Sequence, residues 1–170
     1  HTDAVQIIGH DYVEIQTINV DMLSASAHKF NGPKGVGFLY VKRGTPIEPL
    51  LHGGGQENGM RSGTENVASI VGMATALQEH MKSIKVDRIY LEELRTQLIS
   101  GLHAEHLDFI INGSERHIPG SVSLSFKNVD GEMLLHRLDL MGIAVATGSA
   151  CDSKDTVLSH VIKAIKVPSE

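Results

Sequence analysis

The segment 24–35 reads Ser24-Ala-Ser-Ala-His-Lys-Phe-Asn-Gly-Pro-Lys-Gly35, and it decides how the chain around it folds. The apolar and small residues that lead into it predict a strand over 20–27. The glycines and proline of 32–35 predict a turn. Lys29 therefore stands at a strand end, where a crowded site favours the uncharged amine that attacks an aldehyde. The plain alternative is that Lys29 and Lys34 are solvent-exposed charges around an ordinary turn.

The composition excludes several classes of function. The 170 residues carry 15 basic and 20 acidic side chains, and the formal charge of -5 argues against nucleic-acid or membrane binding. No apolar run approaches the roughly 20 residues that span a bilayer, and no signal-peptide pattern opens the chain. Cys151 is the single cysteine, so no internal disulfide can form, and the sequence predicts a reducing, cytoplasmic setting.

Apolar periodicity predicts the elements of the first half of the chain. It indicates a strand end at 1–5 and a further strand at 38–42. Prolines and glycines predict a loop-rich segment over 44–66. Apolar residues then recur at helical spacing, which predicts one long helix or two consecutive ones, over 67–83 and 86–103.

The second half of the chain is predicted to be a compact α/β unit. Its expected elements are strands at 109–111, 121–126 and 143–146 and helices at 133–141 and 157–165. We place a domain boundary within the long helical region, near residue 80. The sequence thus predicts an α/β protein with two domains, over residues 1–80 and 81–170.

Two groups of polar residues follow predicted strands. Asp3 and Gln6 come just beyond the first strand, and Ser26 and His28 alternate along the second, so both face one side. There they can hold a phosphate, while Lys29 carries an aldehyde and a carboxylate keeps a pyridine nitrogen protonated. These requirements together match pyridoxal 5'-phosphate. The plain alternative for Asp3 is that it caps a turn.

The loop-rich segment adds further phosphate-type donors. Gly53-Gly54-Gly55 lets a backbone approach a ligand closely, and Arg61-Ser-Gly-Thr64 ends just before a helix, whose N-terminus favours an anion. The alternatives are a merely flexible loop, a surface charge at Arg61 and a simple N-cap at Thr64. The conjunction of these features is more specific than any one of them.

Cys151 is a second candidate centre. It lies in Ala146-Thr-Gly-Ser-Ala-Cys151-Asp-Ser-Lys, a small and polar segment between a predicted strand and a predicted helix. On an accessible loop, a cation or a helix N-terminus stabilises the nucleophilic thiolate. The alternative is an inert core cysteine, against which the polar neighbours Asp152 and Ser153 weigh. The ten histidines form no convincing metal motif, so no metal site is predicted.

Longer runs of the sequence closely resemble those of cysteine desulfurases, which are pyridoxal phosphate enzymes of fold type I. The resemblance is continuous from Thr2 to about Pro168. It is carried by Ser24–Gly35 with 38–43, by His52–Glu57, by Gly59–Asn66 and by Thr147–Cys151. The Gly-Ser-Ala-Cys context resembles the class with a long, mobile catalytic-cysteine loop, which supplies iron–sulfur assembly and related sulfur pathways.

The resemblance implies a role for each residue around the cofactor. Lys29 would hold pyridoxal phosphate as a Schiff base and remove the Cα proton of the substrate, L-cysteine. Asp3 would pair with the pyridine nitrogen and Gln6 with the phenolic oxygen. Ser26 and His28 would bind the phosphate.

The resemblance also implies a second subunit and a sulfur acceptor. Thr64 would reach the phosphate held by the other subunit, so a homodimer would form the site. Cys151 would accept the substrate sulfur as a persulfide and leave alanine as the product. The persulfide sulfur would then pass to an acceptor or scaffold protein.

The chain differs from family members in its extent. Members are more than twice as long, and the part before Asp3 normally supplies a histidine stacked on the cofactor and further phosphate donors. The part after Glu170 normally supplies an arginine for the substrate carboxylate. We therefore expect a C-terminal fragment, in which 1–80 ends the large cofactor domain and 81–170 is most of the small domain. Alone, it is expected to be weakly active or inactive.

Two other functions remain open on the residues alone. One is a related enzyme of the same fold, such as a lyase that prefers selenocysteine. The other is a non-catalytic module that binds sulfur-transfer partners through the Cys151 segment. Cys151 favours desulfuration, because attack on the substrate sulfur requires an acceptor thiol.

Overall fold

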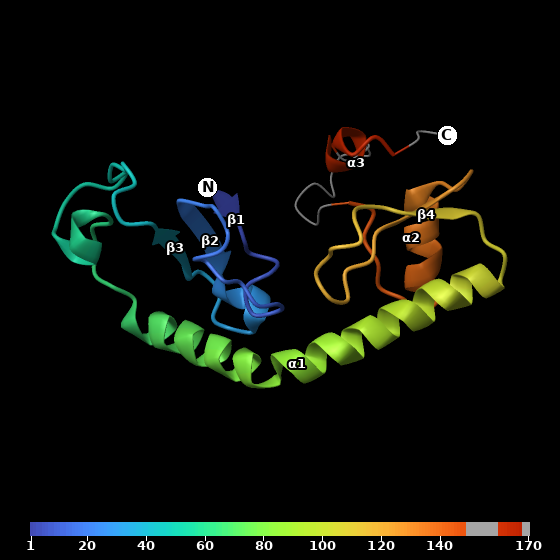
Figure 1. Ribbon diagram of the computed structural model, residues 1–170, viewed down its shortest axis with the longest axis horizontal. Coiled ribbons are helices and arrows are strands. Elements are labelled where there is room, and N and C mark those ends of the chain that lie inside the picture. The colour runs from blue at the N-terminus through green and yellow to red at the C-terminus, as the bar shows by residue number, and fades with distance from the viewer. Residues whose placement is uncertain (149–159, 168–170) are drawn as a thin grey trace. The chain divides into compact units, whose positions relative to one another are not determined.

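The computed structural model describes residues 1–148 and 160–167, so Cys151 lies outside the described residues. The chain divides into two compact units, one of His1–Glu93 with Ile118–Gly120 and one of Leu94–His117 with the described residues from Ser121 on. The division falls within α1 (Val67–Ala104), the same helix in which the sequence places a boundary near residue 80 (Figure 1).

A three-stranded sheet forms the centre of the first unit. It contains β1 (Thr2–Asp3), β2 (Met22–Ser26) and β3 (Gly37–Val41), in the order β1-β2-β3. β1 runs parallel to β2, with Asp3 opposite Ser24, and β3 runs antiparallel to β2. Because β1 and β2 are parallel, their carboxyl ends lie at the same edge of the sheet.

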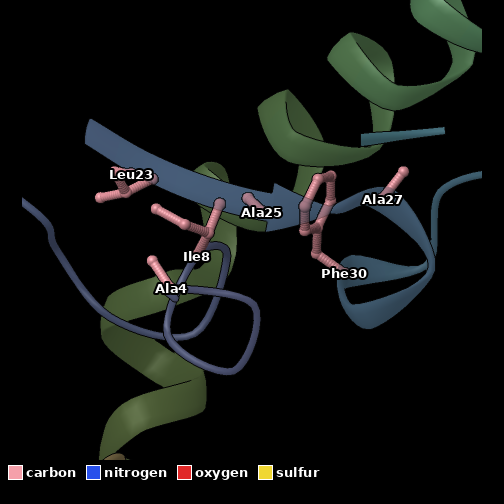
Figure 2. Close-up of a cluster of buried hydrophobic side chains, with 6 residues drawn as sticks. All are labelled: Ala4, Ile8, Leu23, Ala25, Ala27 and Phe30. Atoms are coloured by element: carbon pink, nitrogen blue, oxygen red, sulfur yellow. The ribbon is translucent and has the colours of Figure 1, made fainter. Parts of the chain in front are cut away.

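The core of the first unit lies on one face of β2 and continues into the turn after it. Leu23 and Ala25 are buried while the other three residues of the strand are half-buried, as alternation along a strand requires. The cluster also includes Ala4, Ile8, Ala27 and Phe30, all drawn in Figure 2. Partly buried residues of α1 pack against it, namely Met73, Ala76 and Leu77.

The helical region is one continuous helix rather than two. α1 begins at Val67, and Asn66 Oδ1 accepts the N–H of Ser69 at 3.2 Å, as an N-cap residue does. The preceding loop contains the short 3₁₀ segment η2 (Gln56–Gly59), in keeping with the predicted loop-rich segment. No helix among the described residues combines the length and the apolar content that crossing a bilayer takes.

The second unit contains a two-stranded sheet and helices. β4 (Phe109–Ile111) pairs antiparallel with β5 (Leu124–Phe126), and α2 (Gly131–Leu140) follows. Asp130 caps α2, because its Oδ1 accepts the N–H of Met133 at 2.9 Å. α3 (His160–Ala164) lies within the helix predicted over 157–165, whose first three residues are outside the described residues.

One predicted element of the second unit is wrong. Residues 143–146 were expected to form a strand, but in the described part of the chain they belong to no strand. Ile143 and Val145 are 46% and 49% exposed, and the sheet of β4 and β5 offers no third strand among the described residues. Apolar β-branched residues favour extended backbone, but a strand also needs a paired neighbour.

Candidate active site

Lys29 lies in a 3₁₀ turn that directly follows β2. This turn is η1 (Ala27–Phe30), and it begins at the last residue of the strand predicted over 20–27. A 3₁₀ helix has three residues per turn, so Ala27 and Phe30 share one face, and both have no exposed surface. His28 and Lys29 lie off that face and are exposed. The lysine is therefore presented outward from a turn that is fixed in the core.

Ser26 and His28 are brought into contact beside Lys29. Ser26 is the last residue of β2, and its Oγ lies 2.9 Å from His28 Nδ1. Whichever of the two groups donates in this hydrogen bond, the other keeps a donor for an anion, either the O–H of Ser26 or the N–H at Nε2 of His28. The structure thus places the two predicted phosphate residues together at the carboxyl end of β2.

Asp3 and Gln6 lie at the same edge of the sheet. Asp3 ends β1, the parallel neighbour of β2, and is exposed, as is Gln6 in the turn that follows. Asp3 Oδ1 accepts the N–H of Val5 at 2.9 Å, so this aspartate does cap a turn. A carboxylate has two oxygens, and this single bond to Oδ1 is compatible with a further partner. Ligands of open α/β sheets bind outside the carboxyl ends of the strands, which is where these residues stand.

Thr64 belongs to a loop whose hydrogen bonds stay within the loop. The N–H of Gly63 donates to Gln56 Oε1 at 3.2 Å, and Ser62 Oγ donates to the carbonyl of His52 at 3.1 Å. Arg61 Nη1 donates to the carbonyl of Ser62 at 2.6 Å, so this guanidinium folds back on its own loop. Among the described residues, no hydrogen bond joins this loop to the Lys29 turn.

The N-cap alternative for Thr64 is wrong. Asn66, and not Thr64, accepts the capping hydrogen bond from the first turn of α1. Thr64 itself is exposed.

Sequence reasoning missed the residues that hold the Lys29 turn in place. His10 Nε2 lies 2.8 Å from the carbonyl oxygen of Lys29, and Asn31 Nδ2 lies 3.0 Å from His80 Nε2. Asn31 has φ 60, and an asparagine before Gly32 is a recognised signal for the left-handed residue that ends a helical turn. No local pattern marks His10 or His80, because each contacts a residue far away in the sequence.

The strand-end residues fit pyridoxal phosphate by their chemistry. Lys29 is an exposed amine on a fixed turn, Ser26 and His28 are adjacent donors, and Asp3 is a carboxylate at the same sheet edge. An amine for an aldehyde, donors for a phosphate and an acceptor for a protonated pyridine are the groups that this cofactor requires.

Comparison with known proteins agrees with this chemistry. Residues 1–166 match the aminotransferase class-V family. The cysteine desulfurase IscS of Dictyoglomus turgidum is 48% identical over 171 residues, which cover 100% of this chain and 43% of that protein. The chain thus spans less than half the length of the curated relatives it matches.

Solved structures agree as well. A NifS-like protein superposes with a TM-score of 0.76 at 45% identity, over 85% of this chain and 40% of that chain. A structure described as SspA in complex with cysteine gives a TM-score of 0.69 at 29% identity, over 99% of this chain and 46% of that one. The predicted fold class, α/β and part of a fold-type-I enzyme, is therefore confirmed. This chain, similar throughout its length to cysteine desulfurases, belongs to the aminotransferase class-V family.

Proposed function

We propose that the full-length protein is a cysteine desulfurase that uses pyridoxal phosphate to convert L-cysteine to L-alanine and a protein-bound persulfide. One observation carries the proposal. Lys29 stands exposed on a turn fixed in the core, at the sheet edge where the parallel strand β1 ends in Asp3. The similarity to cysteine desulfurases over the whole chain and the cysteine bound to one structural relative support the choice of substrate.

In this proposal the strand-end residues hold the cofactor and move one proton. Ser26 and His28 would hold the phosphate, Asp3 the pyridine nitrogen and Gln6 the phenolic oxygen. Lys29 Nζ would hold the cofactor aldehyde, and as a free amine it would accept the proton from the substrate Cα. When bound, the cofactor supplies an electron sink for the charge left on the substrate.

Cys151 completes the reaction in the proposal. Its thiolate attacks the substrate sulfur, so a sulfur–sulfur bond forms while the carbon–sulfur bond breaks and its electron pair stays with the carbon. Protonation of that carbon, together with return of a proton to Cα, gives alanine, and the sulfur remains as a persulfide on Cys151. An acceptor or scaffold protein then takes this sulfur, for iron–sulfur cluster assembly or another transfer pathway in the cytoplasm.

The domain assignment belongs to the same proposal. Residues 1–80, which contain every proposed cofactor ligand, would be the end of the large cofactor-binding domain. Residues 81–170, which contain Cys151, would be most of the small domain. The short share of the relatives that this chain covers supports a larger parent protein.

Product analysis tests the proposed reaction. The full-length protein, loaded with cofactor and given L-cysteine and a thiol reductant, is expected to release alanine and sulfide in equal amounts. Amino-acid analysis and a sulfide assay measure the two products. Alanine formed from selenocysteine but not from cysteine would instead identify the selenocysteine-preferring alternative.

A homodimer with a shared site makes a separate prediction about Thr64. Its exposed hydroxyl would bind the phosphate in the partner subunit, so Lys29 and Thr64 of one site come from different chains. Co-expression of Lys29→Ala with Thr64→Val should give hybrid dimers with one intact site. With random pairing, the mixture should recover about a quarter of the wild-type desulfurase activity.

The control for this experiment co-expresses two single variants whose changed residues come from the same chain of a site. Lys29 and Ser26 belong to the same site in the same chain, so co-expression of Lys29→Ala with Ser26→Ala leaves a defect in every site. No recovery is expected in that mixture. Equal recovery in both mixtures, or none in either, would contradict the shared site.

A further inference from the structure

The carbonyl oxygen of Lys29 has a partner outside its own turn. The last carbonyls of a helical turn lack partners within the turn, and Ala27 O already accepts the N–H groups of Asn31 and Gly32. His10 Nε2 lies 2.8 Å from Lys29 O. Because a carbonyl only accepts, His10 Nε2 carries the proton and donates it. His10 thus supplies the donor that the end of the turn requires.

The segment Gly9–Asp11, which we call the strap, is packed directly against this turn. Gly9 has φ +86, and a Cβ at this position would lie 2.5 Å from Phe30 Cβ, so only glycine lets the chain pass here. At the other end of the strap, Asp11 forms an ion pair with Arg88 of α1. The strap is therefore held on both sides of His10.

A second contact ties the same turn to α1. Asn31, which reverses the chain after the turn, places Nδ2 3.0 Å from His80 Nε2. The His80 ring lies edge-on to the His10 ring, with centroids 5.8 Å apart and an interplanar angle of 74°. Both imidazoles are half-buried. Together they hold the Lys29 carbonyl and the residue that ends its turn.

We propose that His10 is a positioning residue that sets the direction in which Lys29 presents its amine. The inference rests on the proposed function and extends it to a residue outside the cofactor ligands. Fixing the carbonyl oxygen of Lys29 fixes its ψ angle, while buried Ala27 and Phe30 fix the rest of the turn. The Cα–Cβ bond of Lys29 then leaves the turn in one direction, and Nζ searches a smaller volume. This matters because misplacing a reacting group by about 1 Å can cost on the order of a hundredfold in rate.

Three substitutions of His10 in the full-length protein separate the hydrogen bond from packing. His10→Ala removes the donor and the ring. His10→Phe keeps a ring against His80 but removes the donor, and His10→Gln keeps an N–H donor at the ε position but removes the ring. Two rates are measured for each: the return of the visible absorbance of lysine-bound cofactor when the apo-protein is mixed with pyridoxal phosphate, and kcat with L-cysteine.

His10→Ala and His10→Phe are expected to slow both rates roughly tenfold to a hundredfold, with KM little changed. His10→Gln is expected to recover most of both rates. The midpoint temperature of thermal unfolding should rank the variants differently, with His10→Phe closer to wild type than His10→Ala. The matched control is His136→Ala, an exposed histidine on α2, which should leave both rates unchanged.

Two results would overturn the inference. One is wild-type rates in all three variants. The other is rates that follow thermal stability, with His10→Phe as fast as His10→Gln, because packing alone would then explain the effect. Lys29→Ala, measured in parallel, distinguishes a failure of the His10 inference from a failure of the proposed function. Its failure to attach cofactor upholds the role of Lys29 whatever the His10 variants do.

Discussion

Replacing Lys29 by alanine in the full-length protein is expected to abolish covalent attachment of pyridoxal phosphate. Lys29 is exposed and directly follows His28, on a turn that two buried residues fix in place. Without this amine the cofactor has no group to bond to, and the substrate Cα loses its base. The purified variant should lack the visible absorbance of lysine-bound cofactor, and desulfuration should fall by at least about a hundredfold.

Lys34 provides a matched control for this change. It is a second exposed lysine on the turn that follows, five residues along the chain from Lys29. Lys34→Ala should keep the absorbance, and borohydride reduction followed by peptide mapping should still find the cofactor mass on Lys29. Cofactor mass on another lysine in the wild-type protein would show that the attachment site is assigned incorrectly.

Replacing Cys151 by serine is expected to separate cofactor binding from sulfur transfer. The proposed cofactor ligands lie within residues 3–64, so the absorbance of lysine-bound cofactor should remain. A serine hydroxyl is not ionised at neutral pH and forms no persulfide, so the release of alanine from L-cysteine should fall by at least about a hundredfold. Wild-type protein after reaction should also carry the mass of one added sulfur atom on the Cys151 peptide, and the variant should not.

The neighbouring Ser153 supplies the comparison for this variant. Ser153→Ala changes the same polar segment without touching a thiol, and it should keep both the absorbance and alanine formation. Turnover by Cys151→Ser at the wild-type rate would show that another residue is the nucleophile. Loss of the cofactor absorbance in Cys151→Ser would show that the substitution damages binding rather than chemistry.

Much of the fold was predictable because its signals are local. The run of apolar and small residues over 20–27 predicts β2, and the helical spacing after Asn66 predicts α1, and the structure confirms both elements. Strand pairing is not local, so the strand predicted over 143–146 is wrong. These four residues have strand-like composition but no paired strand among the described residues. The 3₁₀ turn at Lys29 was not predicted either. The burial of Phe30 that fixes this turn depends on core residues from other parts of the chain.

The candidate site, too, is predictable in part, where its signals are local. The positions of Asp3, Ser26 and Lys29 relative to strand ends follow from the sequence, and parallel pairing of β1 with β2 brings them to one edge. The contacts of His10 with Lys29 and of His80 with Asn31 join residues 19 and 49 positions apart in the chain. A single sequence carries no signal for such contacts, since either histidine alone reads as a surface residue.

The burial of Ala27 and Phe30 on one face of the Lys29 turn links heat inactivation to unfolding. Local opening of a segment costs little where few apolar groups are buried, and approaches the full unfolding free energy where the core itself must open. The turn cannot open without exposing Phe30 and Ala27, both of which are fully shielded from water. On heating, the Lys29 turn should therefore keep its geometry until the first unit unfolds. No folded intermediate in which this turn alone is open is expected.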